Sequence, residues 1–292
     1  MEEVQNPLAG RSAVDCPAKI NLLKPDPSAA PRPRVCAVSY LNTVPLVWGM
    51  LHGPQCGLFD LTFCLPSECA ARLEDDAADI GIVPSIEAAR QGLATIPGAG
   101  IACRGPVRSI LLITKVPPEK IRTVALDSSS RSSAMLARIV LSRRYASHPQ
   151  VVSMPPDVPA MLKAADAALV IGDPALRTER NQPGLSTLDL GGEWCEMTGL
   201  PMVFAVWACR EKSMADDLRE PFLQSCRFGL AHMDDIVRTE AAPRNLPESL
   251  AREYFARHVV LELGEREYEG MRLFVQYARE FDTVVSTGGV TA

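Results

Sequence analysis

Residues 127–133, with the sequence DSSSRSS, concentrate hydroxyl groups and one guanidinium directly after an apolar run. The apolar residues that follow, at positions 135, 136, 139 and 140, recur with the period of an α-helix. A helix N-terminus presents unpaired N–H groups and a partial positive charge, which makes it a natural seat for an anion. The segment therefore predicts a carboxylate- or phosphate-binding turn with four candidate ligands: Ser129, Ser130, Arg131 and Ser132. A serine-rich helix cap with an exposed arginine is the alternative.

Two further turns carry groups that could hold a small anion. In residues 103–109, CRGPVRS, a Gly-Pro turn sets Arg108 and Ser109 just ahead of an apolar run. Arginine recognises carboxylates through its fork of donors. In residues 39–46, SYLNTVPL, Asn42 offers both a donor and an acceptor. Solvated arginines on a surface turn and a turn-forming asparagine are the alternatives for these two segments.

The sequence offers few strong acids or bases for catalysis and no pattern typical of a metal site. Its four histidines lack H-x-x-H or H-x-x-x-H spacing, and no Ser/His/Asp order or Cys/His pair stands out. Nine cysteines, several inside apolar runs and none in a C-x-x-C motif, indicate buried, reduced thiols. The phosphate-binding G-x-x-x-x-G-K-[ST] and G-x-G-x-x-G motifs are absent. We therefore expect no metal, and a chemistry that depends on positioning and electrostatics.

Four short apolar runs, each followed by a polar residue, predict the strands that position these groups. The runs are residues 35–38, 80–83, 123–126 and 167–172, and the polar residues are Ser39, Ser85, Asp127 and Asp173. The distance from the first polar residue to the second is 46 positions in both pairs, which predicts two similar α/β lobes. Ligands of open α/β sheets bind outside the carboxyl ends of the strands. We therefore expect Ser39, Ser85 and Asp173 among the ligand-binding residues of a cleft between the lobes.

Long apolar segments at 109–114 and 202–208 suit the crossings between the lobes, and amphipathic patterns then predict helices near 216–238, after Pro247 and after Gly264. The expected fold is α/β, a two-lobed type II periplasmic-binding-protein-like fold with a ligand cleft between the lobes. We expect residues 1–33 to form a flexible N-terminal extension. Lobe one is predicted to contain residues 34–116 plus 206–292, and lobe two residues 117–205.

The bulk composition excludes several classes of partner. A net charge of −5 argues against nucleic acid, which usually selects a basic face. No stretch reaches the length of a membrane span, and the first residues lack the basic and apolar regions of a signal peptide. We expect a cytoplasmic protein with a small-molecule substrate and neither a nucleic-acid nor a membrane partner. The choice between monomer and homodimer is left open.

Six strings in order, spread over residues 34–278, resemble the chorismate dehydratases of menaquinone biosynthesis by the futalosine route. They are residues 38–43 (VSYLNT), 82–87 (IVPSIE), 104–109 (RGPVRS), 128–133 (SSSRSS), 171–176 (IGDPAL) and 198–207 (TGLPMVFAVW). The first 33 residues have no counterpart in the family core. Where the family usually has threonine in the hydroxyl-rich turn, this sequence has serine, so the hydroxyl groups are kept.

The resemblance implies a cofactor-free hydro-lyase that dehydrates chorismate to 3-[(1-carboxyvinyl)oxy]benzoate. The family's catalytic asparagine falls on Asn42 and its catalytic serine on Ser109, and its hydroxyl-rich turn falls on residues 129–132. Because no histidine base is evident, we hypothesise that the enolpyruvyl carboxylate of the substrate takes the proton. On this hypothesis Asn42 and Ser109 orient polar groups of the substrate.

Two other functions are weighed against this one. The sister enzyme of the same pathway, 1,4-dihydroxy-6-naphthoate synthase, shares the fold and is expected to use a histidine at its centre. The predicted second lobe contains a single histidine, His148, beside Pro149 in a segment that suits a surface loop. A non-catalytic small-anion binding protein is the other alternative, since a fold does not fix a function.

Overall fold

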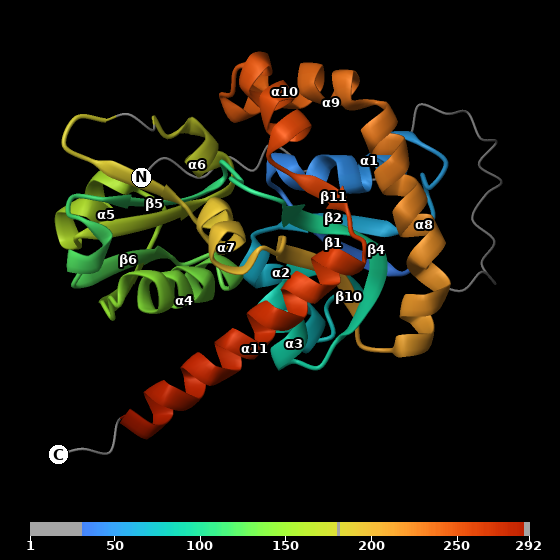
Figure 1. The fold of residues 1–292 in the computed structure, drawn as a ribbon. Coiled ribbons are helices and arrows are strands. Elements are labelled where there is room, and N and C mark those ends of the chain that lie inside the picture. The colour runs from blue at the N-terminus through green and yellow to red at the C-terminus, as the bar shows by residue number, and fades with distance from the viewer. Residues whose placement is uncertain (1–30, 180–181, 289–292) are drawn as a thin grey trace.

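Two β-sheets, each covered by helices, form the computed structural model, which describes residues 31–179 and 182–288 (Figure 1). The first sheet has the order β11-β4-β10-β3-β1-β2, with β1 (Arg34–Val38), β2 (Asp60–Cys64), β3 (Ile80–Pro84), β4 (Ala94–Cys103), β10 (Met202–Cys209) and β11 (Val260–Glu262). The second has the order β7-β6-β8-β5-β9, with β5 (Ile110–Thr114), β6 (Thr123–Asp127), β7 (Gln150–Met154), β8 (Ala167–Ile171) and β9 (Ser186–Asp189). The extension expected at residues 1–33 lies outside the described residues, except for 31–33, which precede β1.

The two sheets repeat one strand arrangement, as the 46-residue spacing predicted. In lobe one the parallel strands β2, β1 and β3 are followed by the antiparallel strand β10, and then by β4. In lobe two the parallel strands β7, β6 and β8 are followed by the antiparallel strand β5, and then by β9. Here lobe one is the first sheet with its helices and lobe two the second.

A matching aspartate closes the same position in both lobes. Asp79, just before β3, accepts the backbone N–H of Arg34 at 2.7 Å. Asp166, just before β8, accepts the N–H groups of Arg122 and Thr123 at 2.9 and 3.0 Å. The two carboxylates satisfy donors at the starts of β1 and β6, the middle strands of the three parallel strands in each lobe. The similarity between the two halves of the sequence therefore reflects equivalent positions in the two lobes.

The crossings between the lobes differ from the predicted division at two strands. β5 was placed in lobe one, but it pairs with β8 and β9 in the second sheet. β10 was divided between the lobes at residue 205, but along its whole length it pairs with β3 and β4 of the first sheet. The chain thus crosses before Ile110 and returns before Met202. Both strands are almost entirely apolar, so their composition suits either sheet and only the pairing decides which one they join.

The described residues contain eleven α-helices, most of which pack on the sheets. Lobe two has α4 (Ser132–Tyr145), α5 (Val158–Ala164), α6 (Gly172–Arg177) and α7 (Leu190–Thr198). Around lobe one lie α1 (Val44–His52), α2 (Pro66–Glu74), α3 (Ser85–Arg90), α8 (Lys212–Ala231), α9 (Met233–Glu240), α10 (Glu248–Arg257) and α11 (Glu265–Gly288). The short 3-10 helices are η2 (Leu41–Thr43), η3 (Pro118–Lys120) and η4 (Ala242–Arg244). No helix in the described ranges has the length and apolar character needed to cross a bilayer.

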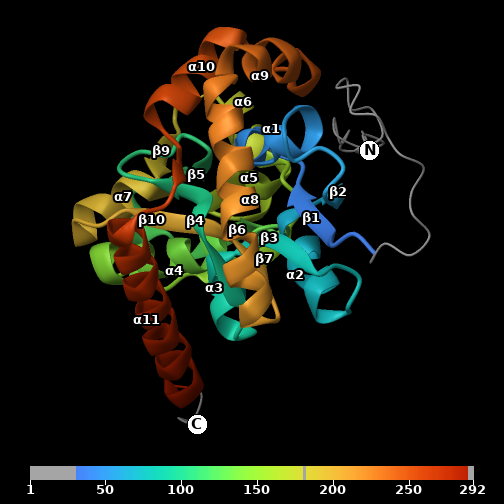
Figure 2. The same ribbon diagram turned by 90° about the vertical axis from the view of Figure 1, so that its right-hand side faces the viewer.

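The single helix expected near 216–238 is in fact two helices that meet at His232. The backbone N–H of His232 bonds the carbonyls of Phe228 and Gly229, and its ring nitrogen Nδ1 lies 2.7 Å from the Phe228 carbonyl oxygen. These bonds satisfy carbonyls at the end of α8, so the chain can turn into α9 without leaving them unpaired. The break brings α9 and α10 over one end of the molecule, whereas α11 runs towards the other (Figure 2).

Helices from the C-terminal part of the chain contact both lobes. α11 packs on β10 and α3 of lobe one and on α4 of lobe two. On α11, Glu280 pairs with Arg143 of α4, and the ring of Phe281 lies 4.8 Å below the guanidinium of Arg138. The C-terminal segment thus joins the two lobes independently of the two crossings.

A buried ionic network ties η4 to both lobes. Arg244, which is 2% exposed, lies 3.3 Å from the carboxylate of Asp173 in lobe two and pairs with Glu240 of α9. It also donates to the Ser39 carbonyl of lobe one at 3.3 Å. Asp173 in turn accepts the Leu41 backbone N–H at 2.9 Å. One arginine therefore holds the end of β1 against the end of β8.

Arg244→Ala is expected to lower the free energy of unfolding by about 3–5 kcal/mol, because it leaves buried carboxylates without a counter-ion. The measurement is urea denaturation followed by circular dichroism. The matched control is Arg252→Ala, which removes an exposed ion pair with Asp234 and should change little. Equal, small losses for both variants would contradict the role given to Arg244.

Candidate functional site

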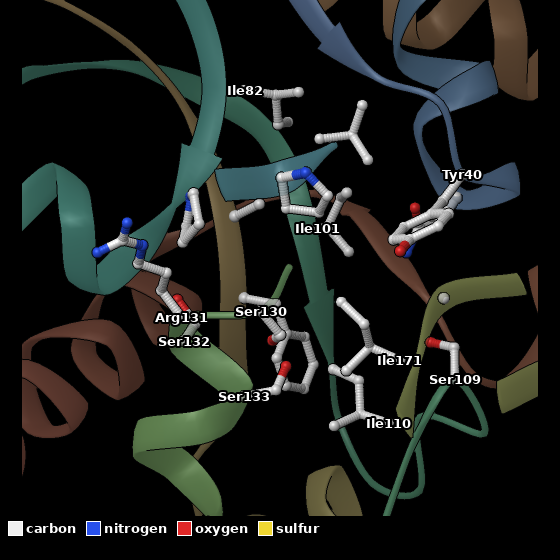
Figure 3. Close-up of a pocket in the computed structure, with 17 residues that line it drawn as sticks. Tyr40, Ile82, Ile101, Ser109, Ile110, Ser130, Arg131, Ser132, Ser133 and Ile171 are labelled. Carbon is white, nitrogen blue, oxygen red and sulfur yellow. The ribbon is translucent and has the colours of Figure 1, made fainter. Parts of the chain in front are cut away.

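A cavity lies between the two lobes, and polar groups from both lobes reach it (Figure 3). Its polar lining residues are Tyr40, Asn42, Ser109, Ser130, Arg131, Ser132 and Ser133. The remaining lining residues are Val38, Pro66, Ile82, Pro84, Ile101, Ile110, Ile171, Gly172, Phe204 and Ala205. Tyr40 and Ser109 lie on one side of the view and Ser130 to Ser133 on the other, with isoleucines between them. Apolar walls of this kind strengthen electrostatic interactions with a bound ion.

The N-termini of several helices converge on this cavity. Pro66 and Ser132 are the first residues of α2 and α4, and Gly172 is the first residue of α6. Pro84 caps α3, and Asn42 lies in η2 at the start of α1. The convergence follows from the topology, because the helices begin where the parallel strands end. Helix N-termini carry partial positive charge, so together they favour an anion in the cavity.

The serine-rich turn leads into α4 as predicted. Some of its hydroxyls line the cavity, and some contact the other lobe. The Oγ of Ser132 accepts the backbone N–H of Ile86 at 3.3 Å, and it lies 3.2 Å from the Oγ of Ser85. Ser85 itself donates to the Val203 carbonyl at 2.7 Å, so Ser132 is the donor in the pair of hydroxyls. Ser132 thus docks α4 onto the start of α3, which leaves Ser130 and Ser133 as the turn's cavity hydroxyls without such a contact.

Among the described residues that line the cavity, Arg131 is the one with a positively charged side chain. It is exposed, and within residues 31–179 and 182–288 it forms no ion pair. Figure 3 shows it at one edge of the cavity beside Ser132. An unpaired guanidinium next to a helix N-terminus can bind a carboxylate with little competition.

Ser129 faces a buried carboxylate rather than the cavity. Its backbone N–H and its hydroxyl both donate to Asp127 Oδ1, at 2.9 and 2.7 Å. Because its own proton is used, the Ser129 hydroxyl can accept the hydroxyl proton of Tyr40, 3.4 Å away in lobe one. Burial raises the pKa of Asp127. This small network links the two lobes at the cavity's edge.

The expected catalytic pair, Asn42 and Ser109, meets at a third residue that the sequence did not single out. The Ser109 hydroxyl lies 2.9 Å from the hydroxyl of Tyr254, and the Asn42 side chain lies close enough to the same phenol to lower its pKa. Tyr254 is fully buried in α10, and this burial raises its pKa, so the hydroxyl remains protonated. The phenol therefore fixes the positions of an amide from lobe one and a hydroxyl from the crossing.

The crossing that carries Ser109 is held by Asp189. Its carboxylate accepts the N–H groups of Val107 and Arg108 at 2.8 and 2.7 Å, and it also caps α7 through the N–H groups of Gly191 and Gly192. Arg108 adopts a φ of +65°, which a non-glycine residue takes up only when other contacts hold it. These contacts orient the crossing so that Ser109 enters the cavity.

Arg108 does not reach the cavity. Its guanidinium donates to the carbonyls of Ala175, Leu176 and Thr178 at 3.0–3.2 Å, at the end of α6. The Ala175 carbonyl also accepts the N–H of Thr178, and a cation at this end of the helix is favoured by the helix dipole. The guanidinium that was expected to bind a carboxylate of the ligand therefore binds carbonyl groups at the end of α6.

The structure brings together five of the ten residues predicted from the sequence: Asn42, Ser109, Ser130, Arg131 and Ser132. The other five lie just behind the cavity wall and join elements of the fold: Ser39, Ser85, Arg108, Ser129 and Asp173. Sequence reasoning missed Tyr40, Ser133 and Tyr254. Tyr40 and Ser133 belong to strings that it quoted, but Tyr254 reaches the site only because α10 folds over the cleft.

Among solved structures, the fold is that of the periplasmic binding proteins, as the sequence predicted. A protein from Archaeoglobus fulgidus is similar with a TM-score of 0.66 and 16% identity, over 89% of this chain and 98% of that chain. The aliphatic sulphonate binding protein SsuA of Escherichia coli is similar with a TM-score of 0.62 and 14% identity, over 87% and 88%. These identities support a shared fold.

The sequence comparisons define the family more narrowly. The family described as "Menaquinone biosynthesis" matches residues 33–280, and the chain belongs to this family. A chorismate dehydratase of Campylobacter jejuni is 25% identical over 82% of this chain and 94% of its own length. A chorismate dehydratase of Thermus thermophilus is 26% identical over 81% of this chain and 92% of its own length.

Gly172 is a sensitive position, because Tyr40 packs against it across the lobes. It has a φ of +61°, and a Cβ there would lie 2.6 Å from the Tyr40 ring. Gly172→Ala should therefore lower the free energy of unfolding by more than the roughly 1–2 kcal/mol that the backbone strain alone would cost. The control is Gly184→Ala, with a φ of +78° and nothing within 4 Å of the added atom. Urea denaturation of both variants tests this, and equal losses would contradict the close contact.

Proposed function

We propose that this protein is a chorismate dehydratase, a lyase that converts chorismate to 3-[(1-carboxyvinyl)oxy]benzoate and water. The observation that carries the proposal is the cavity, where helix N-termini and Arg131 face Asn42 and Ser109. Chorismate bears two carboxylates, and this cavity favours anions. Family membership and the names of the two dehydratase relatives support the same reaction.

One carboxylate of chorismate is expected at the start of α4. There the backbone N–H groups of the first turn, the hydroxyls of Ser130 and Ser133 and the guanidinium of Arg131 are available to it. The N-terminus of α1 in lobe one follows Tyr40 and Asn42 on the opposite side of the cavity, where it favours the second carboxylate. The apolar lining between them suits the ring.

The proton acceptor is expected to be the substrate itself. Of the described residues that line the cavity, none is Asp, Glu, His or Lys, so the protein places no ordinary base there. The reaction removes the C4 hydroxyl and the C3 hydrogen, and the ring becomes aromatic. The enolpyruvyl group is attached at C3, so its carboxylate can take the C3 proton, which leaves with the C4 hydroxyl as water. Asn42 and Ser109 hold the polar groups in place while this happens.

Closure of the lobes excludes water from the cavity during the reaction. The Ser85–Ser132 and Tyr40–Ser129 hydroxyl contacts and the Leu41–Asp173 bond all cross the cleft next to the cavity. Because they are hydrogen bonds, they can break to admit substrate and form again around it. Lid closure of this kind is common where water would compete with the reaction.

Purified protein incubated with chorismate, without added metal or cofactor, should release a product lighter by one water with an aromatic ultraviolet spectrum. Chromatography with mass detection follows the conversion. Chorismate recovered unchanged from folded protein would contradict the proposal, and would favour a binding protein or the sister naphthoate synthase. Against that synthase, His148 is exposed in the loop after α4 and lies outside the cavity lining.

Asn42→Ala and Ser109→Ala should each lower kcat for chorismate by at least about 100-fold, because each removes a group placed against the reacting centre. Steady-state kinetics on the purified variants measures this. Ser147→Ala is the matched control, since Ser147 is also buried but donates to the Ile121 carbonyl, away from the cavity. Full activity of either site variant would remove that residue from the mechanism.

Tyr254→Phe should lower kcat roughly tenfold with little change in KM, because the phenol orients Asn42 and Ser109 and does not line the cavity. The kcat and KM values from initial rates test this split. Tyr268→Phe is the control, since its hydroxyl bonds the Gly98 N–H instead. If both variants keep wild-type kcat, the positioning role of Tyr254 is wrong.

A further inference from the structure

Three buried cysteines from separate elements of lobe one meet at one point. Cys36 lies on β1, Cys64 ends β2, and Cys69 lies on α2, which packs on β1 and β3. The Sγ atoms are 3.0 Å apart for Cys36 and Cys64, 3.3 Å for Cys36 and Cys69, and 3.0 Å for Cys64 and Cys69. The side chains are at most 4% exposed. Nothing in the proposed dehydratase mechanism uses this cluster.

The size of the sulfur triangle is close to that of a metal site. Its centre lies about 1.8 Å from each sulfur, given the three separations. A movement of about 0.5 Å per sulfur would give the ~2.3 Å metal–sulfur distance of thiolate sites. Such a shift is within side-chain rotation, and the short separations become more relaxed as the triangle widens.

One positive charge, that of Arg72, acts on the sulfurs of Cys36 and Cys64. The Arg72 guanidinium donates to Thr62, which is the residue opposite Cys36 in the β1–β2 register.

We propose that Cys36, Cys64 and Cys69 form a three-thiolate site for one soft monovalent cation, Cu(I). Thiolates select Cu(I), Zn²⁺ and iron–sulfur clusters. Structural Zn²⁺ almost always takes four ligands, whereas no fourth His, Cys, Asp or Glu joins this group in the described part of the chain, and its burial leaves no room for solvent. Three thiolate sulfurs arranged around the ion in one plane complete the coordination of Cu(I).

Binding changes no oxidation state. One Cu⁺ forms three Cu–S bonds, and the protons still carried by the thiols are released to solvent. The site lies behind the cavity wall, because Cys64 is opposite Val38 in the strand register and two residues before Pro66. A bound ion therefore cross-links β1, β2 and α2 at the point where they reach the cavity.

The test is an anaerobic titration of the reduced, full-length protein against a coloured Cu(I)–chelator complex. The wild type should withdraw one equivalent of Cu(I), show sulfur-to-copper absorption in the ultraviolet and melt at a higher temperature. Cys36→Ser and Cys64→Ser should bind at least tenfold more weakly. Cys226→Ser, which removes another fully buried cysteine, should behave as the wild type does.

Folding of each variant is checked by circular dichroism. If the serine variants fail to fold, alkylation of the wild type with iodoacetamide in mild denaturant takes their place, and Cu(I) should protect the Cys36, Cys64 and Cys69 peptides but not Cys226. Equal Cu(I) affinity in all variants, no uptake by the wild type, or a disulfide among the three cysteines of the protein as purified would each overturn the proposal.

Discussion

The convergence of helix N-termini at the carboxyl ends of parallel strands is the constraint on which the rest of the structure depends. Each lobe places its parallel strands in the same order, so the starts of α2, α3, α4 and α6 face one cavity. The chain carries a net charge of −5, and it still offers an anion a favourable site. Backbone N–H groups supply the positive potential that the overall composition lacks.

Polar residues around the cleft perform two different tasks, although their chemistry is alike. Ser130, Arg131 and Ser109 line the cavity, whereas Ser85 and Asp173 hold the lobes together next to it. The buried Arg244 belongs to the second group. The cavity lining and the contacts between the lobes are therefore formed by residues that are close neighbours in the sequence.

Much of the fold could be predicted from the sequence, because buried parallel strands and an amphipathic helix leave strong local patterns. β1, β3, β6 and β8 and the start of α4 fall where the periodicity placed them. The predicted positions of the crossings were wrong, because the sequence of an apolar strand such as β5 does not indicate which sheet it joins. Tyr254 and Asp189 were missed because their roles depend on contacts between distant segments.

The dependence on contacts between distant segments also explains why only half of the predicted site residues line the cavity. A hydroxyl after a strand indicates a position near the cleft, but not whether its hydrogen bonds go to a ligand or to the protein. Arg108 shows this, because its guanidinium ends α6 instead of binding an anion. The cysteine triangle is a further case, since residues 36, 64 and 69 have no metal-binding spacing in the sequence and meet only in the folded lobe.

The most direct test of the central claim is a crystal structure of the slow Ser109→Ala variant with chorismate bound. The account predicts closed lobes, with one carboxylate accepting hydrogen bonds from the first turn of α4 and from Arg131, and the C4 hydroxyl beside Asn42. Chorismate bound elsewhere, or bound between the lobes with both carboxylates away from the helix N-termini, would contradict it.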